Sequence, residues 1–182
     1  MRVVAGSAKG RRLNAPDGLG VRPTGDRVRE AVFDMLASLD VVQYRRIADL
    51  FAGTGAMGIE ALSQGAAAAF FVEREPAALD VIRTNLVVTG LYSRATVVPG
   101  DVLDWLATAP PVDVALIDPP YAFEEWPAVL ERVQAGTLVL ESDHELDLGP
   151  RWEALKSRRY GGTVVTLAQP AAAPPADEKG SE

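Results

Sequence analysis

The sequence predicts an α/β fold, in which helices cover both faces of a mostly parallel β-sheet. From Arg45 onward, short apolar runs alternate with helical patterns, which is typical of strands joined by right-handed helical crossovers. A glycine-rich turn follows the first apolar run and a proline pair ends a later one, and both lie where such sheets bind ligands. A length of 182 residues suits one domain with a substantial core.

Each element is predicted from its local pattern. The first twenty residues have the strand-like start and the turn residues of a hairpin. A helix follows, capped by Thr24 or Asp26, with apolar side chains at helical spacing from Val28 to Leu39. We then expect strands at 46–51, 68–73, 95–99, 113–118, 137–142 and 162–168. We expect the intervening helices at 55–64, 76–88, 102–108 and 124–134.

The end of the chain predicts a hairpin and a tail. The last strand alternates apolar and polar residues, and the R-R-Y-G-G before it could pair with it in antiparallel fashion. The final residues are rich in Ala, Pro and charge, and they have no apolar pattern. We therefore divide the chain into a basic hairpin extension (1–22), one α/β domain (23–169) and a disordered tail (170–182).

Composition excludes several classes of protein. The chain has no cysteine and one histidine, which excludes disulfides and thiolate metal sites, and we expect no metal. It has no apolar run of about 18 residues that could span a membrane. The amino terminus lacks the apolar core of a signal peptide, so we expect a cytoplasmic protein without membrane contact.

Charge is unevenly distributed along the chain. Residues 1–30 contain seven basic and three acidic side chains, a net of +4, although the whole chain has a net charge of −7. The remainder therefore has a net charge of −11. A basic arm on an acidic protein suits contact with phosphates, and a solvated surface segment is the alternative.

The stretch I-A-D-L-F-A-G-T-G-A-M-G-I-E-A-L (47–62) reads as a strand, a glycine turn and a helix. Gly53 and Gly55 allow a tight turn and close approach of a ligand to the backbone. Asp49 before the turn would repel a pyrophosphate but attract a cationic amino group, and the missing G-K-[ST] argues against a P-loop. Glu73 follows Gly55 by 18 residues and suits a pair of ribose hydroxyls. These features favour S-adenosylmethionine (SAM) over a dinucleotide.

Other polar residues follow the predicted strands. Asp101 and Val102 could hold an adenine, although Asp101 also suits the cap of the next helix. Asn85 lies on the helix after the second strand and fits a surface position as well as a site role, whereas His144 has no partner in the sequence. The predicted cofactor-binding residues are Asp49, Phe51, Gly53, Gly55, Glu73, Arg74, Asp101 and Val102.

The second chemical motif is V-D-V-A-L-I-D-P-P-Y (112–121). Two prolines fix the backbone after the strand, so the Asp118 carboxylate and the Pro119 carbonyl are held as hydrogen-bond acceptors. With Pro120 and the flat ring of Tyr121, they suit a planar base whose exocyclic amine must be oriented. A rigid strand-exit loop is the structural alternative.

These motifs resemble those of a known family. D-P-P-Y resembles the [DNS]-P-P-[YFW] motif of methyltransferases that modify exocyclic amines of bases, and the glycine stretch resembles their SAM motif. The amino-terminal M-R-V-V-A-G-x-x-K-G-R-R-L and the later R-P-T-x-D-R-V-R-E-A-V-F resemble the RsmD family of bacterial 16S rRNA guanine-N2 methyltransferases. The resemblance runs from Met1 to about Leu167.

The resemblance implies a Rossmann-like class I SAM-dependent methyltransferase with a seven-stranded sheet, which methylates one guanine of 16S rRNA. We expect the protein to act as a monomer on an assembled or partly assembled small subunit. It implies catalysis by Asp118, Pro119, Pro120 and Tyr121. We assign RNA contacts to Arg11, Arg12, Arg22, Thr24, Arg27 and Arg29.

The first residue of D-P-P-Y bears on the target base. An ionised Asp only accepts hydrogen bonds, which suits the adjacent N1–H and N2 amine of guanine. An adenine-N6 methyltransferase acting on DNA or RNA, and a non-catalytic RNA-binding factor that uses SAM for stability, remain open.

Overall fold

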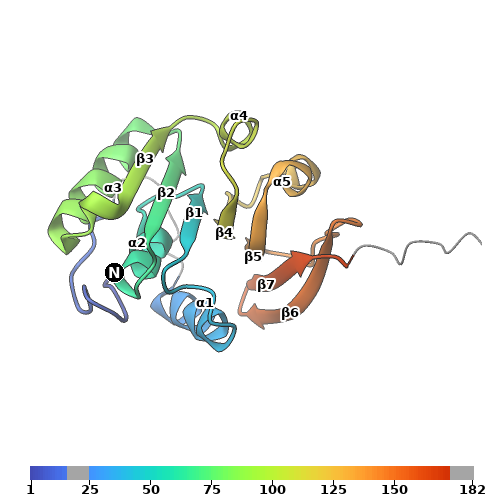
Figure 1. Ribbon diagram of the computed structural model, residues 1–182, viewed down its shortest axis with the longest axis horizontal. Helices are drawn as coiled ribbons and strands as arrows, with labels where there is room; N and C mark the ends of the chain where they lie inside the picture. Colours follow the sequence, from blue (N-terminus) through green and yellow to red (C-terminus); the bar gives the residue numbers. More distant parts are fainter. Residues whose placement is uncertain (16–24, 173–182) are drawn as a thin grey trace, which may run out of the picture.

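The structure, a computed structural model, describes residues 1–15 and 25–172. Within them the chain forms a seven-stranded sheet of order β3-β2-β1-β4-β5-β7-β6 (Figure 1). The strands are β1 Arg46–Leu50, β2 Ala68–Glu73, β3 Ala95–Pro99, β4 Val112–Ile117, β5 Ala135–Ser142, β6 Trp152–Tyr160 and β7 Thr163–Pro170. The helices are α1 Asp26–Ser38, α2 Ala56–Ser63, α3 Pro76–Thr89, the 3₁₀ turn η1 Tyr92–Arg94, α4 Val102–Leu106 and α5 Trp126–Arg132.

The first five strands are parallel, and β7 pairs antiparallel with both β5 and β6. This confirms the predicted mixed sheet with a carboxy-terminal hairpin. The hairpin strand β6 is longer than R-R-Y-G-G indicated, because it begins at Trp152. Its early residues lack a two-residue apolar pattern, since β6 is an edge strand whose side chains are mostly exposed.

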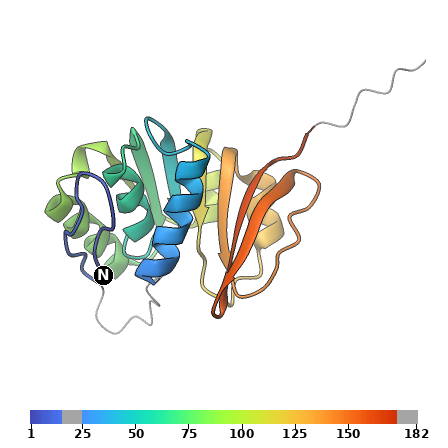
Figure 2. The same ribbon diagram turned by 90° about the horizontal axis from the view of Figure 1, so that it is seen from below.

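Each face of the sheet has its own core. On one face, α1, α2, α3 and the amino-terminal segment pack on alternate strand residues such as Ile47 and Leu116. On the other face, α4 and α5 pack on the intervening residues such as Leu50 and Ile117 (Figures 1 and 2). Burial on both faces explains why these central strands read as continuous apolar runs.

The amino-terminal segment packs on the domain. Val3 and Arg11 are joined by a backbone hydrogen bond of 3.0 Å, and Arg2 and Arg12 form an isolated antiparallel bridge. The side chain of Glu60 on α2 accepts hydrogen bonds from backbone amides of this segment. The described part of the predicted extension is therefore held against α2.

The start of α1 differs from the sequence prediction. Helix α1 starts at Asp26 with Gly25 at its cap, so Asp26 does not cap it. Thr24, and the predicted tail from residue 173 onward, lie outside the described residues. Within the described residues, no helix has the length and apolar character needed to cross a membrane.

Candidate functional site

The candidate site lies at the carboxyl edge of the sheet, between β1 and β4. These neighbouring parallel strands pair Leu50 with Ile117, so the loops that follow them emerge side by side. From β1 the sheet extends through β2 to β3 on one side, and from β4 it extends through β5 on the other side. This reversal of strand order is the position at which open α/β sheets bind ligands.

The loop after β1 has an unusual backbone. Phe51, Gly53 and Gly55 have positive φ angles of 65°, 53° and 74°. A positive φ is rare for a bulky residue such as Phe51 and is typical of functional turns. Gly55 caps α2 in the left-handed conformation, which favours glycine there. The backbone thus forms the tight glycine turn leading into a helix, α2, that the sequence predicts.

Gly58 allows the helix to pack closely on the sheet. A Cβ atom at this position would lie 2.4 Å from Cε1 of Phe71 and 3.1 Å from a carboxylate oxygen of Asp49. The absence of a side chain lets the Gly58 N–H donate a hydrogen bond of 2.8 Å to Asp49. Gly58, the last glycine of G-T-G-A-M-G (53–58), therefore positions Asp49 near the carboxyl end of β1.

Asp49 is a buried carboxyl at the centre of the site, with 3% of its surface exposed. Burial raises the pKa of this carboxyl well above its ordinary value, the Gly58 N–H opposes the rise, and the Asp118 and Glu73 carboxylates add to it. Because the charges of Asp118 and Glu73 act on Asp49, these three acids, which lie at the ends of three different strands, must be near one another. A ligand with a positive charge would relieve this repulsion.

Glu73 joins two loops of the edge. One of its oxygens accepts a hydrogen bond of 2.8 Å from the Gly53 N–H, and the other accepts from Arg74 and Glu75. The side chain is half-buried, so it is held in place while part of it faces solvent. A contact with the cofactor ribose, as predicted, and a capping role before α3 are both compatible with this geometry.

The loop after β3 exposes Asp101 in part but buries Val102. Asp101 caps α4 by accepting a hydrogen bond of 2.8 Å from Leu103, and Arg74 approaches its other oxygen at 3.9 Å. Val102 is 3% exposed because it packs into the core below the loop. The structure therefore does not present Val102 as an open apolar surface for adenine, contrary to our expectation.

The D-P-P-Y loop follows β4 directly. Asp118 is half-buried and Pro119 is buried, while Tyr121 is 47% exposed. The Tyr121 hydroxyl lies 3.1 Å from the hydroxyl of Thr163, the first residue of β7. This contact joins the loop to the carboxy-terminal hairpin, and Thr163 is a residue that sequence reasoning missed.

Aromatic packing connects the two loops of the site. The rings of Phe51 and Phe123 meet edge to face with centroids 5.0 Å apart, and Phe123 in turn meets Trp126 at 5.7 Å. Phe51, which we predicted as a cofactor contact, therefore also packs against the segment that follows Tyr121. The strained turn and the D-P-P-Y loop are fixed relative to each other.

Asn85 is a further positioning residue. It is fully buried, so it is not the surface residue that we considered. Its amide donates to the carbonyl of Thr54 at 2.9 Å and exchanges hydrogen bonds with the backbone of Asn14. Its spacing of three residues from buried Ile82 placed it on the inner face of α3, and this signal could have revealed its burial.

The predicted RNA-contact residues differ in their surroundings. Arg11, Arg12 and Arg27 are exposed, whereas Arg22 and Thr24 lie outside the described residues. Arg29 is fully buried, and its Nε lies 3.3 Å from the Glu60 carboxylate. We correct its assignment, because a side chain buried between α1 and α2 cannot contact RNA.

The residues present fit SAM. Asp49 offers a buried carboxylate for a cationic amino group, and Glu73 offers a fixed carboxylate for ribose hydroxyls. The positive φ angles of Gly53 and Gly55 give the open backbone that a bound nucleoside needs. Within the described residues, no group of three or more His, Asp or Glu side chains is placed to hold a metal ion.

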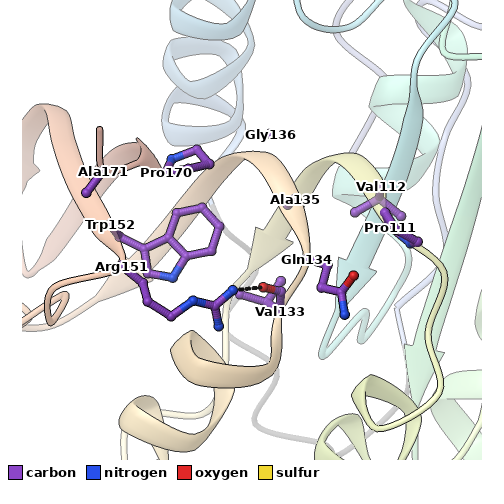
Figure 3. A pocket seen from close by; sticks show the side chains of 10 residues that line it. All are labelled: Pro111, Val112, Val133, Gln134, Ala135, Gly136, Arg151, Trp152, Pro170 and Ala171. Atoms are coloured by element: carbon purple, nitrogen blue, oxygen red, sulfur yellow. Dashed lines mark hydrogen bonds between the residues drawn. The ribbon is translucent and has the colours of Figure 1, made fainter. Parts of the chain in front are cut away.

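A separate hollow of about 600 Å³ lies at the opposite edge of the sheet (Figure 3). Val112 and Ala135, the first residues of β4 and β5, line it together with Arg151 and Trp152. Arg151 points toward the Val133 carbonyl, which is 3.4 Å away. Because it lies at the amino ends of the strands, this hollow is not part of the candidate site.

Comparison with known proteins gives a consistent family match. The family model described as "Conserved hypothetical protein 95" matches residues 1–169. "Putative rRNA methyltransferase YlbH" of Bacillus subtilis is 36% identical over 181 residues, covering 92% of this chain and 97% of that protein. "Ribosomal RNA small subunit methyltransferase D" of Escherichia coli K12 is 39% identical over 122 residues, covering 66% of this chain and 60% of that protein.

Solved structures show the same fold. "Putative methyltransferase yhhF from Escherichia coli" has a TM-score of 0.83 and 30% identity, covering 95% of this chain and 99% of that chain. The structure described as "crystal structure of a putative RNA methyltransferase PH1948 from Pyrococcus horikoshii" has a TM-score of 0.74, covering 88% of this chain and 94% of that chain. Its 17% identity supports the fold alone.

Proposed function

The chain belongs to the family described as conserved hypothetical protein 95, and from this premise we propose that it methylates the exocyclic N2 amine of one guanine in 16S rRNA. The fold is that of class I methyltransferases, which implies SAM as the cofactor. Two similar proteins are named as rRNA methyltransferases, one of them of the small subunit, which supports rRNA as the substrate class.

The observation that carries the proposal is the position of the D-P-P-Y loop beside the glycine loop. Asp118 lies near enough to Asp49 to raise the pKa of that carboxyl. Phe51 and Phe123 pack the two loops together. An acceptor for a base amine and the carboxylate expected to hold the cofactor are therefore parts of one site.

When bound, SAM supplies an electrophilic methyl group on a positively charged sulfonium. The amine of a base is a poor nucleophile because its lone pair is conjugated with the ring. Hydrogen bonds from the amine to Asp118 and to the Pro119 carbonyl would orient it and favour a tetrahedral nitrogen. Asp118 is also placed to accept the proton that the nitrogen loses after it gains the methyl group.

Asp118 and Tyr121 also support a choice of base. An ionised carboxylate accepts both adjacent donors of guanine, N1–H and the N2 amine, whereas adenine presents an acceptor beside its amine. A guanine within a stem must leave its stack to reach this loop, and the half-exposed ring of Tyr121 offers a surface on which it can stack.

For the RNA itself, we propose contact with the exposed Arg11, Arg12 and Arg27. We further propose that the protein acts as a monomer on an assembled or partly assembled small subunit. A small protein with a short arm would then recognise a surface formed by RNA and ribosomal proteins together. Activity on subunits but not on naked rRNA would support this part of the proposal.

The test uses tritiated SAM with small subunits from cells that lack the modification. The wild-type protein, Asp118→Ala and the control Asp80→Ala are compared, since Asp80 is an exposed acid on α3. We expect labelled N2-methylguanosine with the wild type and the control, and a loss of at least 100-fold with Asp118→Ala.

Other labelled products would contradict the proposal. N6-methyladenine would show that the base assignment is wrong and favour an adenine methyltransferase. Absence of label on subunits, rRNA and DNA, with SAM binding intact, would favour a non-catalytic RNA-binding factor. Equal activity of Asp118→Ala and the wild type would remove Asp118 from the mechanism.

A further inference from the structure

The exposed cations that we assigned to RNA lie on one side of the candidate site. Arg11 and Arg12 belong to the amino-terminal segment, and Arg27 lies in the first turn of α1. Burial of Arg29 removes one of the predicted contacts. In Figures 1 and 2, α1 lies between the amino-terminal segment and the β6–β7 hairpin, so the cations of that segment lie on the side of α1 away from the hairpin.

Edge strand β6 carries a second group of cations. Its exposed residues include Lys156 at the middle of the strand, and Arg158 and Arg159 in the half that approaches the carboxyl edge of the sheet. The half at the opposite edge carries the acidic Glu153 instead. The positive charge of β6 is therefore concentrated near the site, in a chain whose net charge is −7.

The hairpin end is physically joined to the catalytic loop. Tyr160, the last residue of β6, pairs with Thr163, and the Thr163 hydroxyl lies 3.1 Å from that of Tyr121. Arg158 precedes Tyr160 by two residues, which is about 7 Å along a strand. A base held at Tyr121 would therefore place phosphates of adjoining nucleotides within reach of the Arg158 side chain.

Pairing within the hairpin also shows which way these side chains face. Lys156 and Arg158 pair with Leu167 and Val165, whose side chains belong to the core on the α1 face of the sheet. Residues paired across antiparallel strands share a face, so Lys156 and Arg158 face the same side as α1. Arg27 at the start of α1 is thus on the same face as these two cations.

We propose that Lys156 and Arg158 form a second RNA-contact surface, which binds the phosphate backbone of the substrate on the side of the site away from the amino-terminal segment. Arg159 pairs with Val164 and faces the other side of the sheet, so it is not part of this surface. This inference rests on the proposed function and adds a binding surface to it. The substrate RNA would cross the carboxyl edge of the sheet, with the target base at Tyr121 and cations on either side.

Protection of an exposed edge strand is the competing explanation for charge on β6. Such protection requires charge anywhere along the strand, whereas the cations gather next to the site and an acid occupies the other half. Arg159 also donates a hydrogen bond of 3.4 Å to the Asp143 carbonyl, in the loop that follows β5. This contact gives Arg159, which lies outside the proposed surface, a partner of its own.

The experiment compares the full-length double variant Lys156→Gln/Arg158→Gln with the matched control Arg45→Gln/Arg46→Gln. Each variant removes two exposed positive charges. The control residues lie at the opposite edge of the sheet, because Arg45 directly precedes β1 and Arg46 is its first residue. Binding of small subunits and of a fluorescent 16S rRNA fragment is measured from 50 to 200 mM salt, and SAM binding is measured by calorimetry.

We expect the β6 variant to weaken RNA binding by about ten-fold at low salt and to reduce the slope of log affinity against log salt by about 1.4 to 1.8, as expected for two lost phosphate contacts. SAM affinity and the control variant should match the wild type. Equal RNA binding by the β6 variant and the wild type would overturn the inference. Wild-type protein that binds no RNA at all would instead contradict the proposed function.

Discussion

Arg29 gives the sharpest distinction between an RNA contact and a structural residue. Its Nε lies 3.3 Å from the Glu60 carboxylate, and the two side chains are 0% and 1% exposed. Its guanidinium also donates to the backbone carbonyl of Arg2. Glu60 accepts hydrogen bonds of 2.8 Å from the amides of Val4 and Ala5. This network joins α1, α2 and the amino-terminal segment.

We predict that Arg29→Ala destabilises the fold without directly removing an RNA contact. Loss of one partner leaves the Glu60 charge buried, and breaking a buried ion pair in this way costs about 3–5 kcal/mol. For a chain of this size, 1 kcal/mol shifts the melting temperature by about 2–4 °C, so we expect a decrease of about 6–20 °C. Thermal and urea unfolding measure this change directly.

Arg27→Ala is the matched control, because Arg27 is exposed and lies two residues earlier on α1. It should change the unfolding free energy by no more than about 0.5 kcal/mol and should weaken RNA binding. Hydrogen exchange at the Val4 and Ala5 amides should accelerate in Arg29→Ala only. If Arg29→Ala keeps the wild-type melting temperature and weakens RNA binding as Arg27→Ala does, the structural role that we assign to Arg29 is refuted.

Three further predictions concern the cofactor side of the site. Asn85→Ala removes the amide that binds the Thr54 carbonyl, so it should cost about 1–3 kcal/mol and weaken SAM binding in calorimetry, whereas unchanged affinity would contradict its positioning role. Gly58→Ala would place a Cβ atom 2.4 Å from Phe71, so its urea midpoint should fall by the equivalent of about 1–3 kcal/mol, and an unchanged midpoint would show that the helix can shift. The pKa of Asp49 is higher in the folded protein than in the unfolded chain, so the folded state favours the protonated carboxyl. Its contribution to the free energy of unfolding is therefore fully present below the ordinary pKa of Asp and is lost as pH rises through the raised pKa. SAM affinity should rise with pH over the same interval, since a cationic amino group prefers the carboxylate, and Asp49→Asn should abolish this dependence.

Much of the fold follows from local patterns in the sequence. Strands of the parallel sheet are buried on both faces, so each is a continuous apolar run bounded by polar or turn residues. Edge strand β6 was harder to predict, because its nine residues are mostly exposed and its pairing is interrupted by an irregularity between Ala154 and Lys156. Its position depends on pairing with β7, which is tertiary information.

The site shows the same division between local and tertiary information. Asp49 and Asp118 could be predicted because each lies at the carboxyl end of an apolar strand, and a parallel sheet brings such ends together. Arg29 and Val102 could not be placed, because a charged residue near a basic segment and an apolar residue beside an acid look the same whether exposed or buried. Packing of α1 on α2 and of α4 on the sheet decided both.

The proposed reaction places opposite electrostatic demands on one edge of the sheet. A cationic cofactor and a base amine require the carboxylates of Asp49 and Asp118, which would repel the phosphates of the RNA that carries the base. The structure separates the two requirements, with carboxylates at the central strand ends and exposed cations on α1 and β6. Interactions between exposed charges are largely screened beyond about 8–10 Å at physiological salt, so the cations can hold phosphates without neutralising the carboxylates. It follows that added salt should weaken RNA binding much more than SAM binding, because the buried Asp49 is less screened than exposed arginines.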